Sequence, residues 1–141
     1  MPMISIQYAT PRATAAPASI IAKAVRQLSS ELLHKDPNVT AIAVERLEPA
    51  NWFVADKSLA EHQLAAFWLD IRVTDGTNTR EEKAAFIAAA FATMNKLIGP
   101  LHSESYVHVD DVRGDAYGYG GLTQNERYAV AKLKPSGKAA A

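Results

Sequence analysis

Two successive stretches of the chain, about 1–65 and 66–131, repeat one order of apolar patterns. Strand-like alternation begins near residue 2 and again near residue 67, and helical periodicity begins near 15 and again near 80. These features are about 65 residues apart, although few residues are identical between the two stretches. A strand, a crossover helix and a second strand typically join two parallel strands. The chain is therefore predicted to contain tandem β-α-β units, followed by a loose tail at 132–141.

The first unit has a short N-terminal strand followed by an amphipathic helix. Ile4, Ile6 and Tyr8 alternate with polar residues, which indicates a strand with one buried face. Apolar residues at helical spacing predict a helix over about 15–34, and a second strand is expected over 40–47. The polar stretch 54–63 is interpreted as a loop or a short helix.

The second unit has the clearest helix boundaries in the chain. Thr79 with Glu82 three residues later forms a capping-box pattern, and Gly99-Pro100 is a stop signal. Strands are expected before and after this helix, over about 66–73 and 105–112, and the glycine-rich stretch 117–121 must turn sharply.

The predicted fold class is α+β, with a four-stranded mixed sheet and both helices on one face. The opposite sheet face is expected to hold apolar residues as well, and an apolar face left in water is unfavourable. Self-association through that face is therefore expected.

Charge and composition narrow the functional classes. Lys plus Arg equals Asp plus Glu, so the formal net charge is zero, and no basic patch suggests a nucleic-acid partner. No apolar run is long enough to span a membrane, and no leader pattern is evident, so a cytoplasmic protein is expected. The chain has no Cys, which excludes disulfides, thiolate nucleophiles and cysteine-metal sites.

Pro2 is the residue with the most distinctive chemistry. If Met1 is removed, Pro2 carries a secondary amine on a rigid ring at the start of a strand, and such an amine can accept and donate a proton. The alternative is that Pro2 only starts the strand, where its missing N–H costs nothing. If Met1 stays attached, the nitrogen is an amide and cannot act as a base.

With Pro2, a β-α-β unit and the turn Tyr117-Gly118-Tyr119-Gly120-Gly121 after a closing strand, the chain resembles the tautomerase superfamily. This superfamily includes 4-oxalocrotonate tautomerase, the chloroacrylic acid enzymes and macrophage migration inhibitory factor. The resemblance covers residues 2 to about 128 as two fused units. It implies a homotrimer of fused subunits and a cofactor-independent keto-enol tautomerase acting on small carboxylated compounds, with the Pro2 amine as general base and acid.

The resemblance also implies substrate-binding residues around Pro2. Arg12 stands where the family has a carboxylate-binding Arg, with a solvated turn residue as the alternative. Tyr117 stands where 4-oxalocrotonate tautomerase has an active-site Phe, and it could instead only anchor the turn. The other candidates are Trp52, the first-half counterpart of Tyr117; Tyr106, at a position where the family has an Arg; and His108, on an alternating strand.

Some family positions differ in this chain. The Arg pair of the chloroacrylic acid enzymes falls near Thr74 and Thr77, which weakens the case for the alternative activity, hydration or dehalogenation of short unsaturated acids. A non-catalytic binding or assembly homologue is the other alternative. His108 and Asp110 are two potential ligands on one strand face, too few for a metal site, so no metal or cofactor is expected.

Overall fold

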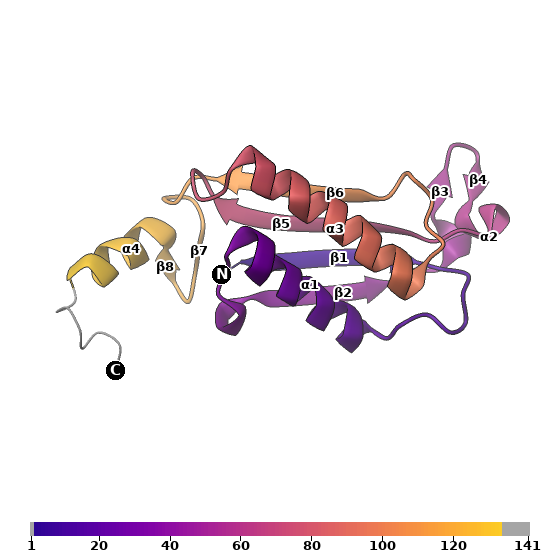
Figure 1. Ribbon diagram of the computed structural model, residues 1–141, viewed down its shortest axis with the longest axis horizontal. Helices are drawn as coiled ribbons and strands as arrows, with labels where there is room; N and C mark the ends of the chain where they lie inside the picture. Colours follow the sequence, from indigo (N-terminus) through magenta and orange to yellow (C-terminus); the bar gives the residue numbers. More distant parts are fainter. Residues whose placement is uncertain (1, 134–141) are drawn as a thin grey trace.

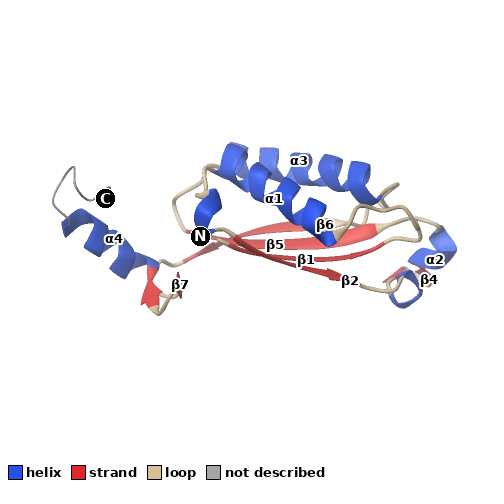
Figure 2. Ribbon diagram, turned by 90° about the horizontal axis from the view of Figure 1, so that it is seen from below, coloured by secondary structure: helices blue, strands red, loops and turns tan. Residues whose placement is uncertain are grey.

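The computed structural model describes residues 2–133, which form a mixed sheet with two long helices on one face (Figures 1 and 2). The four-stranded sheet has the order β2-β1-β5-β6. Strands β1 and β2 are parallel, β1 and β5 are antiparallel, and β5 and β6 are parallel. The main elements are β1 Met3–Ala9, α1 Ala18–Leu33, β2 Ala41–Arg46, β5 Ala66–Thr74, α3 Arg80–Ile98 and β6 Tyr106–Val112. The predicted α+β architecture is confirmed.

Each half of the chain closes with a short hairpin and a helix, and most of this was not predicted. The stretch 54–63, expected as a loop or short helix, contributes to the first hairpin and its helix, and the helix that follows the glycine-rich turn was missed. Of the predicted tail, residues 132 and 133 end this last helix, and 134–141 lie outside the described residues. The smaller elements are η1 Pro37–Val39, η2 Pro49–Asn51, β3 Phe53–Val54, β4 Lys57–Ser58, α2 Leu59–His62, β7 Gly118–Tyr119, β8 Leu122–Thr123 and α4 Gln124–Leu133.

The two hairpins are related by the same repeat interval as the two β-α-β units. The interval from the start of β3 to the start of β7 equals the interval from the start of β4 to the start of β8. Both turns place a residue in the left-handed region at the same repeat position, Ala55 with φ 58° and Gly120 with φ 61°. The following helices share one cap, because Ser58 with Glu61 and Thr123 with Glu126 exchange the two hydrogen bonds of a capping box. The repeat is thus closer in structure than in residue identity.

The core lies between the sheet and the helices α1 and α3. Alternate residues of β1 and β5 point toward the helices and are buried, as the period-two pattern predicts. The helix α3 begins at the predicted capping box, in which Thr79 and Glu82 exchange hydrogen bonds. Within residues 2–133, no helix is both long and apolar enough to cross a membrane. The largest fully buried side chains include Phe67, Phe86, Ile4, Ile6, Ile21, Leu33, Leu69, Ile71, Met94 and Ile98.

The opposite face of the sheet is open and mixed in character. Three large apolar side chains on it are about half exposed: Met3 (47%), Trp68 (44%) and Tyr106 (51%). Most other positions on this face carry polar or charged side chains, including Ser5, Gln7, Asp70, Arg72 and His108. The expected apolar character of this face is therefore concentrated at a few positions.

Candidate active site

Pro2 is buried at the amino end of the central strand β1, immediately before its first residue. Its carbonyl accepts a hydrogen bond from the backbone N–H of Ala41 at 2.9 Å, which continues the parallel pairing of β1 with β2. The missing N–H of proline costs nothing here, since a strand tolerates proline at its first position. The sheet therefore fixes the position of the pyrrolidine ring.

A hollow of about 180 Å³ lies beside Pro2. Its walls come from three parts of the chain that are distant in sequence: the segment after α1, the end of β5 with its following turn, and the start of the second hairpin. They meet because β5 runs antiparallel to β1, so that its carboxyl end lies beside the amino end of β1. The polar and charged side chains that line the hollow are His34, Lys35, Asp36, Arg72, Thr74, Thr77, Tyr117 and Gln124.

Lys35 brings a positive charge to this hollow. Its ammonium group donates a hydrogen bond to the hydroxyl of Thr77 at 3.1 Å. Burial lowers the pKa of Lys35 from its ordinary value, and the negative charges of Glu82 and Asp111 oppose that shift. Sequence reasoning missed Lys35 because it lies in the turn after a helix, where no pattern distinguishes it from a solvated lysine.

Arg72 is the second cation, and it borders two hollows. It also lines a neighbouring hollow of about 260 Å³ on the open sheet face, together with Met3, Ser5, Asp70 and Tyr117. One carboxylate oxygen of Asp70 is buried there without a hydrogen-bond partner. The strand alternation places Arg72 on the open face of β5, but only the pairing of β5 with β1 shows that it adjoins Pro2.

Tyr117 is the predicted site residue that the structure places with Pro2. It lines both hollows, and its phenolic oxygen accepts a hydrogen bond from the backbone N–H of Met3 at 3.2 Å. The side chain thus connects the second hairpin to the residue that follows Pro2.

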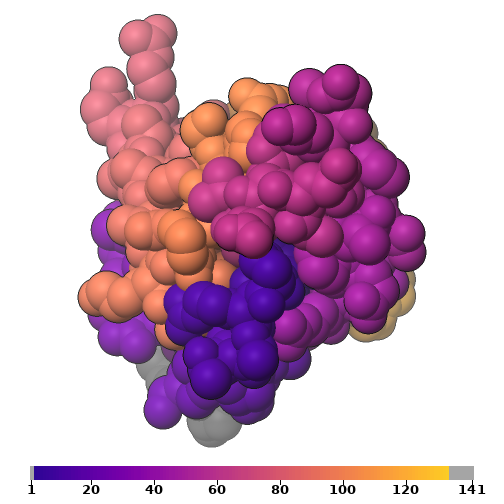
Figure 3. All heavy atoms as spheres, turned by 90° about the vertical axis from the view of Figure 1, so that its right-hand side faces the viewer, coloured from indigo at the N-terminus to yellow at the C-terminus, as the bar shows by residue number. Residues whose placement is uncertain are grey.

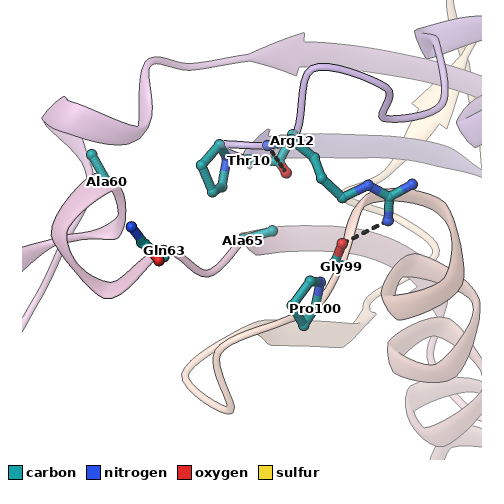
Figure 4. A pocket seen from close by; sticks show the side chains of 8 residues that line it. Thr10, Arg12, Ala60, Gln63, Ala65, Gly99 and Pro100 are labelled. Carbon is teal, nitrogen blue, oxygen red and sulfur yellow. Dashed lines mark hydrogen bonds between the residues drawn. The ribbon is translucent and has the colours of Figure 1, made fainter.

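Arg12 lies beyond the opposite end of β1, in a separate hollow of about 370 Å³ (Figure 4). Figure 3 shows this end of the molecule, where the N-terminal segment (indigo) meets magenta and orange segments from later in the chain. A strand of seven residues separates the two ends by roughly 23 Å. The Arg12 guanidinium donates to the carbonyl of Gly99 at 2.6 Å, and the Thr10 hydroxyl donates to the carbonyl of Ile98 at 2.9 Å. Both contacts satisfy carbonyls at the end of α3, where a positive charge is also favourable. Arg12 can approach Pro2 only if it belongs to a neighbouring copy.

Thr77 is the counterpart of Arg12 in the second unit, because it lies one repeat interval after Arg12 in the sequence. It is this counterpart that lines the hollow beside Pro2. At the Pro2 end of the sheet, the position equivalent to Arg12 therefore holds a threonine and not an arginine. The Thr77 hydroxyl accepts a hydrogen bond from Lys35.

The remaining predicted residues lie away from Pro2 within one chain. Trp52 and Tyr106 line another hollow of about 260 Å³, with Phe53, Trp68 and Glu104 among its other residues. The Trp68 and Tyr106 rings pack with centroids 5.6 Å apart. A hydrogen bond to Glu104 raises the pKa of Tyr106, and the negative charge of Glu104 adds to the shift.

His108 is exposed on the open face, opposite Asp70 in the strand register. No cluster of three or more His, Asp or Glu side chains suited to a metal ion occurs in the described part of the chain.

The same arrangement of strands and helices occurs in solved structures. A fused 4-OT that forms a symmetric trimer matches with a TM-score of 0.72 and 17% identity, over 87% of this chain and 96% of that one. The chain has the fused tautomerase fold. The protein Pt0534, solved after inactivation by 2-oxo-3-pentynoate, has a TM-score of 0.73 and 16% identity, over 89% and 98% of the two chains.

The tautomerase fold of this chain also occurs in more distant structures. A macrophage migration inhibitory factor-like protein from Entamoeba histolytica has a TM-score of 0.67 and 16% identity, over 86% of this chain and 97% of that one. The sequence matches no family model, and no curated protein sequence matches it significantly. At identities of this size, the structural likeness establishes the fold and leaves the activity to be argued from the residues.

Proposed function

We propose that this chain is a cofactor-independent isomerase that interconverts the enol and keto forms of small carboxylated compounds. The observation that carries the proposal is the position of Pro2, buried beside a hollow that also holds the cations Lys35 and Arg72. With Met1 removed, Pro2 has a free amine. The ordinary pKa of an α-amine is near 8, and neighbouring positive charges and burial both disfavour its protonated form.

A neutral amine at this position suits proton transfer between oxygen and carbon. The amine nitrogen takes the proton from the enol hydroxyl, the oxygen forms the carbonyl bond, and the carbon–carbon double bond opens toward the distal carbon. The same nitrogen then returns the proton to that carbon, so that atoms and charges balance. A cation bound to the substrate carboxylate holds the compound beside the amine during both transfers.

We further propose that the active protein is a homotrimer, as the fused 4-OT neighbour is. Two features of this chain support association. The open sheet face carries the half-exposed Met3, Trp68 and Tyr106. The C-terminal arm, formed by β7, β8 and α4 (residues 118–133), extends away from the sheet (Figures 1 and 2). Assembly would also allow Trp52, Tyr106 and His108 of one copy to approach Pro2 of the next, as required if they bind substrate.

The decisive experiment compares the chain that begins at Pro2 with the same chain carrying one additional residue before Pro2. Both are assayed for conversion of the enol forms of short 2-keto acids. Conversion is expected with the free amine and is expected to be lost with the extended chain, because an amide nitrogen has no available lone pair. Equal activity of the two chains would refute Pro2 as the base and make His108 the next residue to test. Absence of activity in both, with the fold intact, would favour the binding or assembly homologue.

A further inference from the structure

We propose that the side-chain oxygen of Gln124 accepts a hydrogen bond from the Pro2 amine, and that this contact directs the lone pair of the amine into the hollow. Gln124 is then a positioning residue, which the sequence pattern did not single out. The inference rests on the proposed function in one respect, because it needs a chain that begins at Pro2. It goes beyond that function by naming the group that orients the base and tunes its protonation.

The first observation is an unpartnered oxygen beside Pro2. Within residues 2–133, three side chains have a buried oxygen that accepts no hydrogen bond, those of Asp70, Asn78 and Gln124. Of these three residues, Gln124 is the one that lines the same hollow as Pro2. A buried acceptor without a donor is unfavourable, so a donor is expected next to the Gln124 oxygen.

The repeat places the Gln124 backbone relative to the sheet. Gln124 is the first residue of α4, and its counterpart Leu59 is the first residue of α2. Both backbone N–H groups donate hydrogen bonds of 2.8 Å, from Leu59 to the carbonyl of Trp52 and from Gln124 to the carbonyl of Tyr117. These two acceptors are also one repeat interval apart. The two side chains therefore start from equivalent places, at opposite ends of the molecule (Figure 1).

The surroundings of Leu59 show what its counterpart faces. Leu59 is fully buried in a small apolar cluster that includes Ala66. Ala66 directly precedes Phe67, which is the counterpart of Pro2. Ala66 therefore corresponds to the residue that precedes Pro2 before the initiator is removed. By the repeat, Gln124 lies beside the position at which a chain that begins at Pro2 has its free amine.

The two units differ in chemistry at this position. In the first unit, Leu59 adjoins an internal peptide bond and is apolar. In the second unit, the neighbouring position can hold a free amine, and the residue is Gln124. Burying part of an amide side chain is unfavourable unless the amide is hydrogen-bonded. The polar residue thus occurs in the unit whose first strand can begin with an amine.

The ring of proline decides which neighbour can accept from its nitrogen. The backbone N–H of Phe67 donates a hydrogen bond to the hydroxyl of Ser105 at 3.3 Å, and Thr40 is the counterpart of Ser105. In Pro2, however, the ring carbon Cδ occupies the place of that N–H. The hydrogens of the free amine point instead toward the place of the preceding residue, where Gln124 lies. Gln124 is therefore the better acceptor, and Thr40 faces the ring.

This contact suits the proton transfers of the proposed reaction. A neutral secondary amine has one N–H and one lone pair, and the protonated amine has two N–H groups. If the Gln124 oxygen holds one N–H in both states, the lone pair is left for the substrate proton. The hydrogen bond is stronger when the amine is charged, so it raises the pKa of the amine.

Charged groups around the hollow also act on the amine. The titratable side chains that line the hollow are His34, Lys35, Asp36, Arg72 and Tyr117. Glu82 and Asp111 act on Lys35 through their negative charges. Lys35 and Arg72 oppose the effect of Gln124, because positive charges disfavour a protonated amine. All these charges stay in place when Gln124 is replaced by another neutral residue, so a change in the pKa of the amine then reports the hydrogen bond.

The test measures the pKa of the Pro2 amine directly by NMR, with carbon-13-labelled proline in a chain that begins at Pro2. The ring-carbon shifts of Pro2 follow protonation of its amine, and the other prolines have no amine. Gln124→Met should lower this pKa by about one pH unit, because a charge-assisted hydrogen bond is lost. Gln124→Glu keeps an acceptor and adds a negative charge, so it should raise the pKa.

Controls distinguish the contact from a general effect of substitution. Gln27→Met replaces an exposed glutamine on α1 and should leave the pKa of the Pro2 amine unchanged. Gln124→Leu introduces the residue of the first unit and is a second neutral variant, which should lower the pKa as Gln124→Met does. Circular dichroism verifies that each variant is folded.

A second measurement needs no titration. Gln124→Met is made in the chain that begins at Pro2 and in the chain with one additional residue before Pro2. Urea unfolding of the four proteins is compared at one protein concentration. The substitution should destabilise the first chain more than the extended chain, because the Pro2 nitrogen of the extended chain has no hydrogen to donate.

The outcomes separate this inference from the proposed function. An unchanged or raised pKa of the amine in Gln124→Met would overturn the inference and leave Pro2 as the base. Equal effects of Gln124→Met on the unfolding of the two chains would overturn it as well. If the pKa and the unfolding respond as expected but enols of short 2-keto acids are not converted, the contact is supported and the isomerase is refuted.

Discussion

The backbone N–H of Met3 donates a hydrogen bond to the phenolic oxygen of Tyr117, at a distance of 3.2 Å between nitrogen and oxygen. This contact joins the first strand to the second hairpin, across more than a hundred residues of sequence, next to Pro2. Tyr117→Phe removes the acceptor and keeps the ring. We expect a loss of unfolding free energy of about 0.5–1 kcal/mol, since the contact is exposed. Urea unfolding measures this loss.

The same variant should also affect the reaction. Because Tyr117 holds the residue after Pro2, loosening this contact should lower kcat severalfold with little change in KM. Tyr119→Phe is the matched control, since the Tyr119 ring stacks under Arg127 and its hydroxyl has no such role in the proposed site. Equal kcat in Tyr117→Phe and the native chain would limit Tyr117 to anchoring the turn.

The pH profile of kcat/KM should report the Pro2 amine. The active form is deprotonated, so kcat/KM should rise with pH through one apparent pKa and then level off. Lys35 and Arg72 line the hollow beside Pro2, and we expect their positive charges to lower the pKa of its amine. Removing either charge should therefore shift the rising limb to higher pH. If the apparent pKa of the kcat/KM profile is the same in Lys35→Met, Arg72→Met and the native chain, these charges do not act on the amine.

The capping box of α3 should make stability sensitive to acid. The backbone N–H of Thr79 and, next, the side chain of Asn78 donate hydrogen bonds that lower the pKa of Glu82. A carboxylate with a depressed pKa stabilises the fold above its unfolded pKa, and this contribution is lost as the pH falls through its folded pKa. Glu82→Gln should therefore destabilise the fold at pH 7, and this loss should shrink toward pH 3, where Glu82 itself becomes protonated.

Urea unfolding at the two pH values, at one protein concentration, tests this prediction. The control is Glu126→Gln, which removes the equivalent carboxylate from the capping box of α4. Its effect on global unfolding should be smaller, because α4 lies on the arm and outside the core that unfolds cooperatively. A Glu82→Gln penalty that is the same at pH 7 and pH 3 would contradict a role for ionised Glu82.

Assembly should depend on the C-terminal arm. Leu122 is 41% exposed and Tyr128 is 66% exposed, which is unfavourable unless a second copy covers them. The double variant Leu122→Asp, Tyr128→Asp should reduce the mass measured by light scattering from three chains to one chain of 15.3 kDa. Ile87→Asp, at an exposed apolar site on α3, is the control and should remain trimeric. A native chain that is monomeric at micromolar concentration would refute the trimer.

The partly buried charge of Lys35 should lower the stability of the fold at neutral pH. Its pKa is lowered mainly by burial, so the folded chain loses the proton before the unfolded chain does. Stability therefore rises with pH between the folded and unfolded pKa values of Lys35, and below both values the buried charge is a cost. Lys35→Met should unfold at a higher temperature than the native chain at pH 7, and this difference should shrink toward pH 10. A lower melting temperature at pH 7 would show that Lys35 stabilises the fold.

Local patterns were enough to predict much of this fold. Alternation along β1 identified Ile4 and Ile6 as buried, because strand side chains point to opposite faces regardless of what packs on them. The capping box at Thr79 and the turn at Gly120 are equally local, since neighbouring residues supply the hydrogen bonds and the left-handed backbone conformation. The resemblance, with its expectation of a fused tautomerase fold, rested on Pro2 and the glycine-rich turn.

Only the tertiary structure decided which side chains surround Pro2. The sequence by itself determined that Pro2 starts a strand and that Tyr117 precedes a tight turn. It did not determine that β5 runs antiparallel to β1, which brings Arg72 and Thr77 to Pro2 and leaves Arg12 at the far end of the strand. Lys35 reaches the same hollow because α1 crosses the sheet and returns the chain to the end of the sheet at which β1 begins. Such proximity arises from long-range strand pairing and helix packing, which no local spacing of residues encodes.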